Sequence, residues 1–486
     1  MKSKTPNVMC QTIVDPLPKL TPTLHSWIQS FLGETNLHQQ LVTDYGSPLN
    51  LHHVDPFIEN YQAYAKVIES FGLSHLVFFA RKANKCKVFV NTAKNHGFGV
   101  DTASFEELNQ CLSMGVDPAK LVLTAAIKTN DVLVLAIKNQ VLIVVDNQDE
   151  IDAIKNLAAS MNIVARVALR VSGFLINGEK MYSRFGFDIN QIETVVTEYV
   201  CTTQHLSYQG MHFHLNGYEI EERVAAFDQL FDVVDSISAM GLSTKFIDMG
   251  GGFLTNYLER EEEWNHFQAE LKLALAGERS PITFQNNGLG YSWSNGTIEG
   301  QLLTYPYYNP TPKEHMLRQI LESPTAHGTV AQGLVDRNIE LRLEPGRSLV
   351  DQTGITLAKV VFRKRDSNGD LLVGLEMNKT QLCSSSADFL LDPILIPINR
   401  KESVETDSVE NAYLVGAYCL ETDVLLKRKI AFPSLPQIGD LVCFPNTAGY
   451  MMHFYESQSH LFELAENLII STNPTGLSAF KVSMEK

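Results

Sequence analysis

The stretch LVFFARKAN, residues 76–84, joins a run of five apolar residues to a polar turn that contains Lys82. A short run rich in valine and phenylalanine is typical of a strand that is buried on both faces. From this point the chain repeats the pattern, because short apolar runs alternate with longer amphipathic stretches. Such alternation predicts β-α units around a parallel sheet.

Eight apolar runs indicate that this sheet closes into a barrel. LVFFA ends at Ala80, and the other runs are FGVD ending at Asp101, LVLTA at Ala125, LIVVD at Asp146, VARVALRV at Val171, GMHFHL at Leu215, KFIDMG at Gly250 and IELRLE at Glu344. The sequence therefore predicts an α/β fold built on a (β/α)8 TIM barrel.

Residues that favour the starts and ends of helices lie between the predicted strands, as a (β/α)8 barrel requires. Asp55 and Pro56 open an amphipathic stretch that Gly72 ends, with proline at a helical position where its missing donor costs nothing. Ser104, followed three residues later by Glu107, predicts a capping box.

The chain divides into three predicted parts. Residues 1–47 form an N-terminal segment, residues 48–352 the barrel, and residues 353–486 a C-terminal β domain, since GITLAKVVFRKR, a turn at SNGD and LLVGLEMN suggest antiparallel strands. A stretch rich in Asn, Gly, Pro and Tyr, at about 280–315, predicts an insertion into the barrel.

Composition narrows the class of protein. A net charge of -16 disfavours nucleic-acid and membrane partners. The N-terminus lacks the apolar stretch of a signal peptide, so we expect a cytoplasmic protein. Seven cysteines, from Cys10 to Cys443 and without a CxxC pair, predict reduced thiols and no metal site.

Polar residues at the ends of the predicted strands are the candidates for chemistry. Lys82 follows the first strand, where partial desolvation would lower the pKa of its amine and favour a nucleophile, although a solvated loop lysine fits the same position. Three glycines, Gly250, Gly251 and Gly252, suit either an oxyanion site or a tight turn without a ligand.

Further candidates lie on other strands. His212 and His214 alternate along GMHFHL, so we expect them to point to opposite faces, which argues against a paired metal site. Glu344 and Arg347 in EPGRS place a carboxylate and a guanidinium at the barrel mouth, where a structural ion pair is the alternative. Cys419 and Tyr450, each taken alone, do not indicate a function.

In order along the chain, several segments resemble motifs of the fold type III pyridoxal-phosphate decarboxylases, the family of diaminopimelate and ornithine decarboxylases. They are FFARKAN, GVDTASFEEL, LTAAIKT, FGF, HFH, DMGGGF, EPGRS, GAYCLETD and NTAGY. The resemblance covers most of the chain. It implies an alanine racemase-like barrel, a C-terminal antiparallel β domain joined by the N-terminal segment, and pyridoxal 5'-phosphate as cofactor.

The resemblance also implies roles for individual residues. Lys82 would carry the cofactor as a Schiff base, His214 would stack on its ring, and Glu344 would pair with the ring nitrogen and keep it protonated. Cys419 would reach the site from the partner subunit of a homodimer and reprotonate the product carbon. Asp101 and Arg170 would lie near the cofactor. The phosphate or the substrate would be held by Gly250, Gly251, Gly252, Gly346, Arg347 and Tyr450.

Departures from the family pattern bear on the substrate. Asn216 and Gly217 replace the usual glycine and serine after the stacking histidine. Lys379 stands where diaminopimelate enzymes carry an arginine, and Glu421 lies one place after the usual acidic position. With Arg347 and Tyr450, these two residues are the predicted substrate contacts.

The predicted reaction is removal of the α-carboxylate of a basic or diamino amino acid such as ornithine, lysine or diaminopimelate, including at a D-centre. Alternatives are a decarboxylase of an amino-acid-derived biosynthetic intermediate, a racemase and an inactive regulatory homologue. Glu344 argues against a racemase, because related racemases place an arginine at the ring nitrogen. Lys82, Glu344 and Cys419 together argue against an inactive protein.

Overall fold

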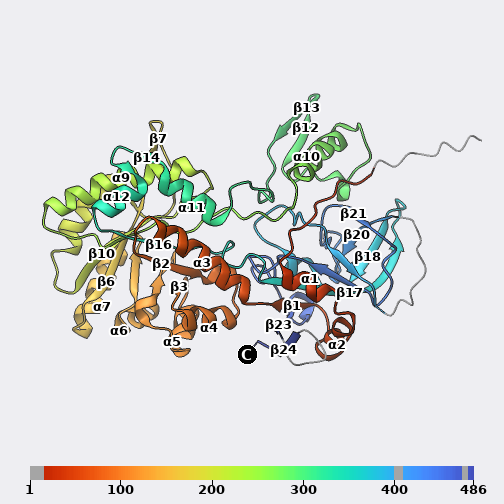
Figure 1. Ribbon diagram of the computed structural model, residues 1–486, viewed down its shortest axis with the longest axis horizontal. Helices are drawn as coiled ribbons and strands as arrows, with labels where there is room; N and C mark the ends of the chain where they lie inside the picture. The colour runs from red at the N-terminus through yellow and green to blue at the C-terminus, as the bar shows by residue number, and fades with distance from the viewer. Residues whose placement is uncertain (1–15, 399–408, 473–479, 486) are drawn as a thin grey trace, which may run out of the picture.

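The computed structural model describes residues 16–398, 409–472 and 480–485 (Figure 1). Residues 1–15, which include Cys10 and most of the segment that argued against a secretory signal, lie outside the described part. Within the described ranges, no helix has both the length and the apolar character needed to cross a lipid bilayer.

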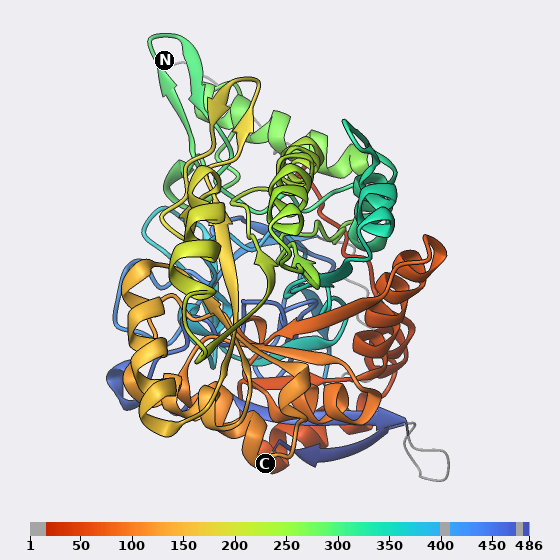
Figure 2. The ribbon, with the colours of Figure 1, turned by 90° about the vertical axis from the view of Figure 1, so that its left-hand side faces the viewer.

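Eight parallel strands form the predicted barrel (Figures 1 and 2). They are β2 (His75–Ala80), β3 (Gly99–Thr102), β4 (Leu121–Leu123), β5 (Leu142–Val145), β6 (Ala165–Ser172), β10 (Leu206–His212), β11 (Phe246–Asp248) and β16 (Glu340–Leu343), with the short β9 (Phe187–Asp188) beside the end of β6. The ring closes because β10 pairs with both β6 and β11. Every predicted run overlaps one of these strands, so the barrel is confirmed.

Helices cover the outside of the barrel. They are α3 (Asp55–Ser70), α4 (Lys87–His96), α5 (Phe105–Ser113), α6 (Asn130–Lys138), α7 (Gln148–Met161), α8 (Ile192–Thr194), which continues as a π-helix (Val195–Val200), α9 (Ile220–Ala239), α11 (Lys313–Glu322) and α12 (Val330–Asp336). Successive side chains of a strand alternate between the two surfaces. Phe79 therefore packs against Phe57 of α3, with ring centroids 5.2 Å apart, while Phe78 belongs to a separate apolar cluster that fills the barrel.

The predicted helix starts agree with the structure. Helix α3 begins at Asp55 with Pro56 in its first turn, and Gly72 adopts a positive φ of 73° just past its end. At α5, Ser104 Oγ accepts a hydrogen bond from the Glu107 backbone N–H, while the Glu107 carboxylate accepts one from the N–H of Ala103.

A second, mainly antiparallel sheet forms the other half of the molecule. Its strands are β1 (Leu49–His52), β17 (Gly354–Arg365), β18 (Leu371–Leu375), β19 (Ile394–Ile396), β20 (Glu410–Val415), β21 (Ile430–Phe432), β22 (Leu441–Phe444), β23 (Glu466–Thr472) and β24 (Phe480–Met484). Helices α1 (Ser26–Leu32) and α2 (Thr35–Tyr45) pack on it. Strand β1 falls inside the range predicted for the barrel, yet it pairs with β17 and β23, so the chain enters the barrel only after His52.

The long segment between β11 and α11 has a structure of its own. It contains α10 (Glu261–Ala276), before the predicted start of the insertion, and a hairpin of β12 (Tyr291–Ser294) and β13 (Thr297–Gly300). Tyr257, Phe267 and Tyr307 of this segment share an apolar core with Val360 and Val373 of the second sheet. The segment therefore leaves the barrel and covers the second sheet, as Figure 1 shows.

Candidate active site

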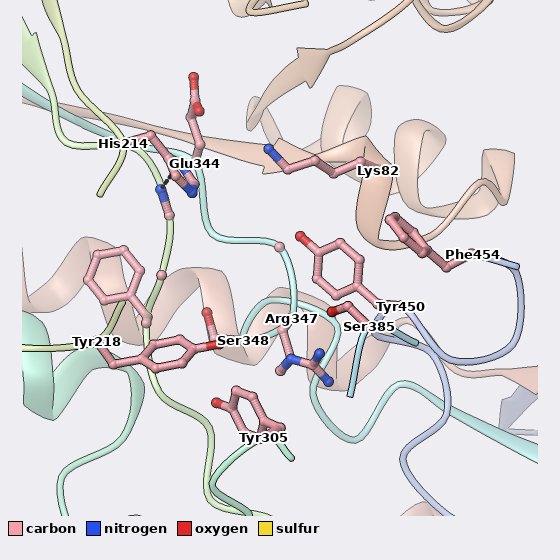
Figure 3. A pocket seen from close by; sticks show the side chains of 14 residues that line it. Lys82, His214, Tyr218, Tyr305, Glu344, Arg347, Ser348, Ser385, Tyr450 and Phe454 are labelled. Atoms are coloured by element: carbon pink, nitrogen blue, oxygen red, sulfur yellow. Dashed lines mark hydrogen bonds between the residues drawn. The ribbon is translucent and has the colours of Figure 1, made fainter. Parts of the chain in front are cut away.

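Lys82 lies at the carboxyl end of the first barrel strand. It belongs to a short 3-10 helix (Arg81–Ala83) directly after β2, and its amine extends into a cavity of about 240 Å³ toward the side where His214 and Glu344 lie (Figure 3). The Lys82 side chain is 38% exposed, and its Nζ lies 3.8 Å from Oδ2 of Asp101.

The expected lowering of the Lys82 pKa is wrong. Burial does lower the pKa of this amine, but the negative charge of Asp101, together with Tyr450 and Glu344, outweighs it, so the pKa is raised. Burial and the nearby Glu344 raise the pKa of Asp101 to about 6, although the Thr124 hydroxyl donates a hydrogen bond to this carboxylate. In the cofactor-free protein, the amine is thus held as a cation between carboxylates.

Glu344 follows β16 and is buried. Its Oε2 lies 3.3 Å from Nε2 of His212, and its Oε1 is buried with no hydrogen-bond partner in the described part of the chain. Burial raises the pKa of Glu344, while Lys82 and Arg170 oppose this shift. One carboxylate oxygen is therefore free to accept a hydrogen bond from a bound group.

The two histidines do not point to opposite faces, so that prediction is wrong. His212 contacts Glu344, and His214 lines the same cavity as Glu344. The reason is the period of a strand: residues two apart share a face, and only adjacent residues point apart. Burial, followed by the charge of Lys82, lowers the pKa of His214, so its ring is neutral at pH 7.

The glycine turn after β11 lies against His214. The Gly251 N–H donates a hydrogen bond to Nδ1 of His214 over 3.1 Å, which fixes the ring. A Cβ at Gly251 would lie 2.7 Å from the Glu344 carbonyl oxygen, and one at Gly250 would lie 2.6 Å from His214 Nδ1. Gly251 and Gly252 line the cavity. Gly250 does not line it and packs closely against His214.

Arg347 and Tyr450 lie on the opposite wall of the cavity (Figure 3). The Arg347 guanidinium carbon lies 4.4 Å from the ring centroid of Tyr305 and 5.3 Å from that of Tyr450, and its Nη1 donates to the Gly449 carbonyl. A Cβ at Gly346 would lie 2.4 Å from the Tyr450 hydroxyl oxygen. EPGRS and NTAGY, which are distant in sequence, therefore form one surface.

Other predicted site residues lie elsewhere in the chain. Arg170 stacks on Phe185, with its Nη1 3.9 Å from Asp146, in an adjoining cavity that shares His214. Cys419 and Glu421 are exposed and line a separate groove, and Lys379 Nζ donates to the Thr422 carbonyl beside them. Within one chain, these last three residues do not line the Lys82 cavity.

Several residues of the cavity wall were missed by sequence reasoning. They are Tyr218, Phe253, Tyr305, Ser348, Ser385 and Phe454. Tyr305 comes from the segment between β11 and α11, and its hydroxyl accepts a hydrogen bond of 2.7 Å from the Thr255 N–H. Its only sequence signal was the cluster of tyrosines in the predicted insertion.

Comparisons with known proteins agree with this geometry. Residues 55–281 match the family described as pyridoxal-dependent decarboxylase, pyridoxal binding domain. The protein y4yA of Sinorhizobium fredii, described only as uncharacterized, is 30% identical over 94% of this chain and 91% of its own. Diaminopimelate decarboxylase of Pseudomonas aeruginosa is 25% identical over 84% and 83%, respectively.

Among solved structures, diaminopimelate decarboxylase of M. jannaschii in complex with L-lysine matches with a TM-score of 0.68 and 18% identity, over 92% of this chain and 91% of the other. The chain belongs to the fold type III pyridoxal-dependent decarboxylase family, and it is a pyridoxal-phosphate-dependent amino-acid decarboxylase.

The described residues fit this cofactor. A lysine amine for the aldehyde, a buried carboxylate oxygen without a partner for the ring nitrogen, and a glycine turn that a Cβ would fill all meet at one cavity. Pyridoxal phosphate needs this donor set.

Proposed function

We propose that this protein removes the α-carboxylate of a basic or diamino amino acid similar to ornithine, lysine or diaminopimelate. The observation that carries the proposal is one cavity in which the Lys82 amine faces Glu344, whose Oε1 has no partner among the residues that the structure describes. The basic character of the substrate is supported by the relatives named diaminopimelate decarboxylase and by the similar structure that binds L-lysine.

The chain's own residues have separate roles in this proposal. When bound, the cofactor withdraws electrons from the Cα that loses carbon dioxide. Lys82 holds the cofactor covalently, and Glu344 keeps a proton on the ring nitrogen through Oε1, with His212 beside its other oxygen. His214, fixed by Gly251, supports the ring from one side.

Arg347 and the glycine turn bind the anionic groups. The guanidinium presents a permanent charge between two tyrosine rings, and the backbone N–H groups of Gly251 and Gly252 border the same cavity. We assign the phosphate or the substrate carboxylate to this wall. Asp101 pairs with Lys82. Arg170 lies in the adjoining cavity, which His214 also lines, and would influence the cofactor through this histidine.

The proposal also includes a homodimer with shared active sites. Cys419 is exposed, and Tyr418 next to it stacks on the rings of His460 and Phe462. Large apolar side chains are exposed around it, with Leu420 at 53% and Leu461 at 93%. Such a patch is typical of a protein interface. Pairing would bring Cys419, Lys379 and Glu421 of one chain to the cavity of its partner.

A substrate screen tests the proposed activity. We expect carbon dioxide release from at least one of L- or D-ornithine, lysine, arginine and meso-diaminopimelate, and no release by the Lys82→Ala variant. Optical rotation is followed in parallel. Racemisation of these compounds without carbon dioxide release, or no reaction of the cofactor-saturated protein with any of them, would contradict the proposal.

A further inference from the structure

A second cluster of metal-binding side chains lies where the barrel meets the second sheet. His52 ends β1, Cys86 is the N-cap residue of α4, and His453 follows β22 in the loop that also carries Tyr450. Their ligand atoms lie within 4.8 Å of one another, and none of the three lines the Lys82 cavity. His52 and Cys86 are buried, with 0% and 3% of their surface exposed.

A fourth polar atom completes the cluster. Oδ1 of Asn467, on β23, lies 3.1 Å from His52 Nε2, 2.8 Å from His453 Nε2 and 3.6 Å from Cys86 Sγ, and the sulfur lies 3.3 Å from His52 Nε2. Tetrahedral zinc, with bonds of about 2.0–2.3 Å, requires ligand atoms about 3.3–3.6 Å apart. The two distances from the sulfur, 3.3 and 3.6 Å, match the edges of such a tetrahedron, and the two distances from the imidazole nitrogens to Oδ1, 3.1 and 2.8 Å, are shorter.

The contacts of the two imidazoles and the thiol converge on one oxygen atom. Nδ2 of Asn467 donates to the Ala465 carbonyl, so Oδ1 faces the cluster. Without a metal, the two imidazole N–H groups can both donate to this oxygen, which has two lone pairs, while the thiol lies 3.3 Å from His52 Nε2 and Nδ2 of Asn50 lies 3.5 Å from His453 Nε2. A cation at the centre lets all four atoms act as electron-pair donors, the role in which His, Cys and amide oxygen share one site.

Negative charge near the cluster also suits a cation. The Glu485 carboxylate, which accepts from the N–H groups of Lys87 and Val88, places compensating negative charge at the same helix start.

We propose that His52, Cys86 and His453, with Oδ1 of Asn467 as the fourth ligand, bind a structural zinc ion. Cys86 follows Lys82 by four residues, and His453 follows Tyr450 by three. The ion would join the two segments that build the cofactor cavity, next to the hydrogen bond from the Tyr450 N–H to the Ala83 carbonyl. Sequence spacing did not indicate this site, because its ligands come from four separate segments.

Metal analysis of the full-length, cofactor-loaded protein tests the proposal. Purified without a histidine tag from zinc-supplemented cells, it should contain about one zinc per chain, with X-ray absorption showing one sulfur near 2.3 Å among nitrogen and oxygen ligands. Cys86→Ala and His453→Ala should each lose the zinc. Cys443→Ala, which removes an equally buried thiol elsewhere in the second sheet, should keep it.

A chelator experiment on the unmodified protein covers the case in which the variants fail to fold. Removal of zinc with dipicolinate should lower the thermal midpoint, and added Zn²⁺ should restore it. A zinc-free unmodified protein, copper in place of zinc, zinc retained by both folded variants, or a midpoint unchanged by zinc removal would each overturn the proposal.

Discussion

His212 and Glu344 form a buried pair in which Nε2 of the imidazole lies 3.3 Å from Oε2 of the carboxylate. Both side chains are 1% exposed, and the pair leaves Oε1 of Glu344 without a partner among the described residues. A buried unpaired carboxylate oxygen costs free energy unless a ligand supplies a donor. This unpaired oxygen lies where we propose that the ring nitrogen of the cofactor binds.

Substitution Glu344→Gln tests this role. The amide fits the same space but cannot keep the ring nitrogen protonated, so we expect the cofactor to bind and kcat to fall about 100-fold or more. Cofactor content by absorbance and turnover by carbon dioxide release check this. Glu340→Gln, at the opposite end of the same strand, is the matched control, and equal losses in both variants would refute the role.

Substitution Lys82→Ala should abolish the covalent attachment. The visible absorbance of bound pyridoxal should disappear, no pyridoxal adduct should be found on this peptide after borohydride reduction, and activity should fall more than about a thousandfold. Lys85→Ala removes an exposed amine three residues away, which pairs with Glu456, and should keep both signals. Absorbance that persists in Lys82→Ala would end the assignment.

The fold followed from local patterns, because each barrel strand is a short apolar run and some helix starts carry a local signal such as a capping residue or a proline. Pro56 and Ser104 mark helices in the structure as they do in the sequence. The resemblance also named Lys82, His214 and Glu344, which line one cavity because the strand ends of a barrel converge at one mouth.

Residues that reach the cavity by long-range packing could not be predicted. Tyr305 arrives because its segment packs on the second sheet, and no periodicity within that segment encodes the contact. The sign of the Lys82 pKa shift was also out of reach, since it depends on Asp101, 3.8 Å away and on another strand.

Tyr305 should contribute to cofactor binding through its hydroxyl. Tyr305→Phe keeps the ring beside Arg347 but leaves the buried Thr255 N–H without its acceptor, a cost of about 1–3 kcal/mol. Because Thr255 closely follows the glycine turn, we expect the cofactor dissociation constant to rise about tenfold. Tyr308 is a half-buried tyrosine outside the cavity, so Tyr308→Phe should leave the dissociation constant unchanged. An equal rise in both variants would mean that the effect comes from a general loss of stability and not from the Tyr305 hydroxyl.

The buried carboxylates predict a pH dependence of stability. The pKa of Asp101 is raised to about 6 by burial and by Glu344, so the folded cofactor-free protein holds this proton more tightly than the unfolded chain. The stabilisation is complete below about pH 4 and is lost as the pH rises through about 6. Asp101→Asn should remove the part of this dependence that Asp101 contributes and make the slope shallower, which thermal unfolding of the cofactor-free protein from pH 4.5 to 7 measures.

Exposed Asp131→Asn, in the first turn of α6, controls for the loss of a carboxylate. If the midpoint of Asp101→Asn changed with pH as steeply as that of the unmodified protein, Asp101 would not be the titrating group.

Cys419 should act in the cavity of the partner chain. Cys419→Ala alone should slow turnover and leave the cofactor bound, since Cys419 lies outside the cavity of its own chain. Mixing Lys82→Ala and Cys419→Ala chains at equal amounts makes half of the dimers mixed, each with one complete site if the sites are shared. Activity should then recover to about a quarter of the unmodified level. No recovery, although native mass spectrometry shows mixed dimers, would place Cys419 in its own chain's site or outside catalysis.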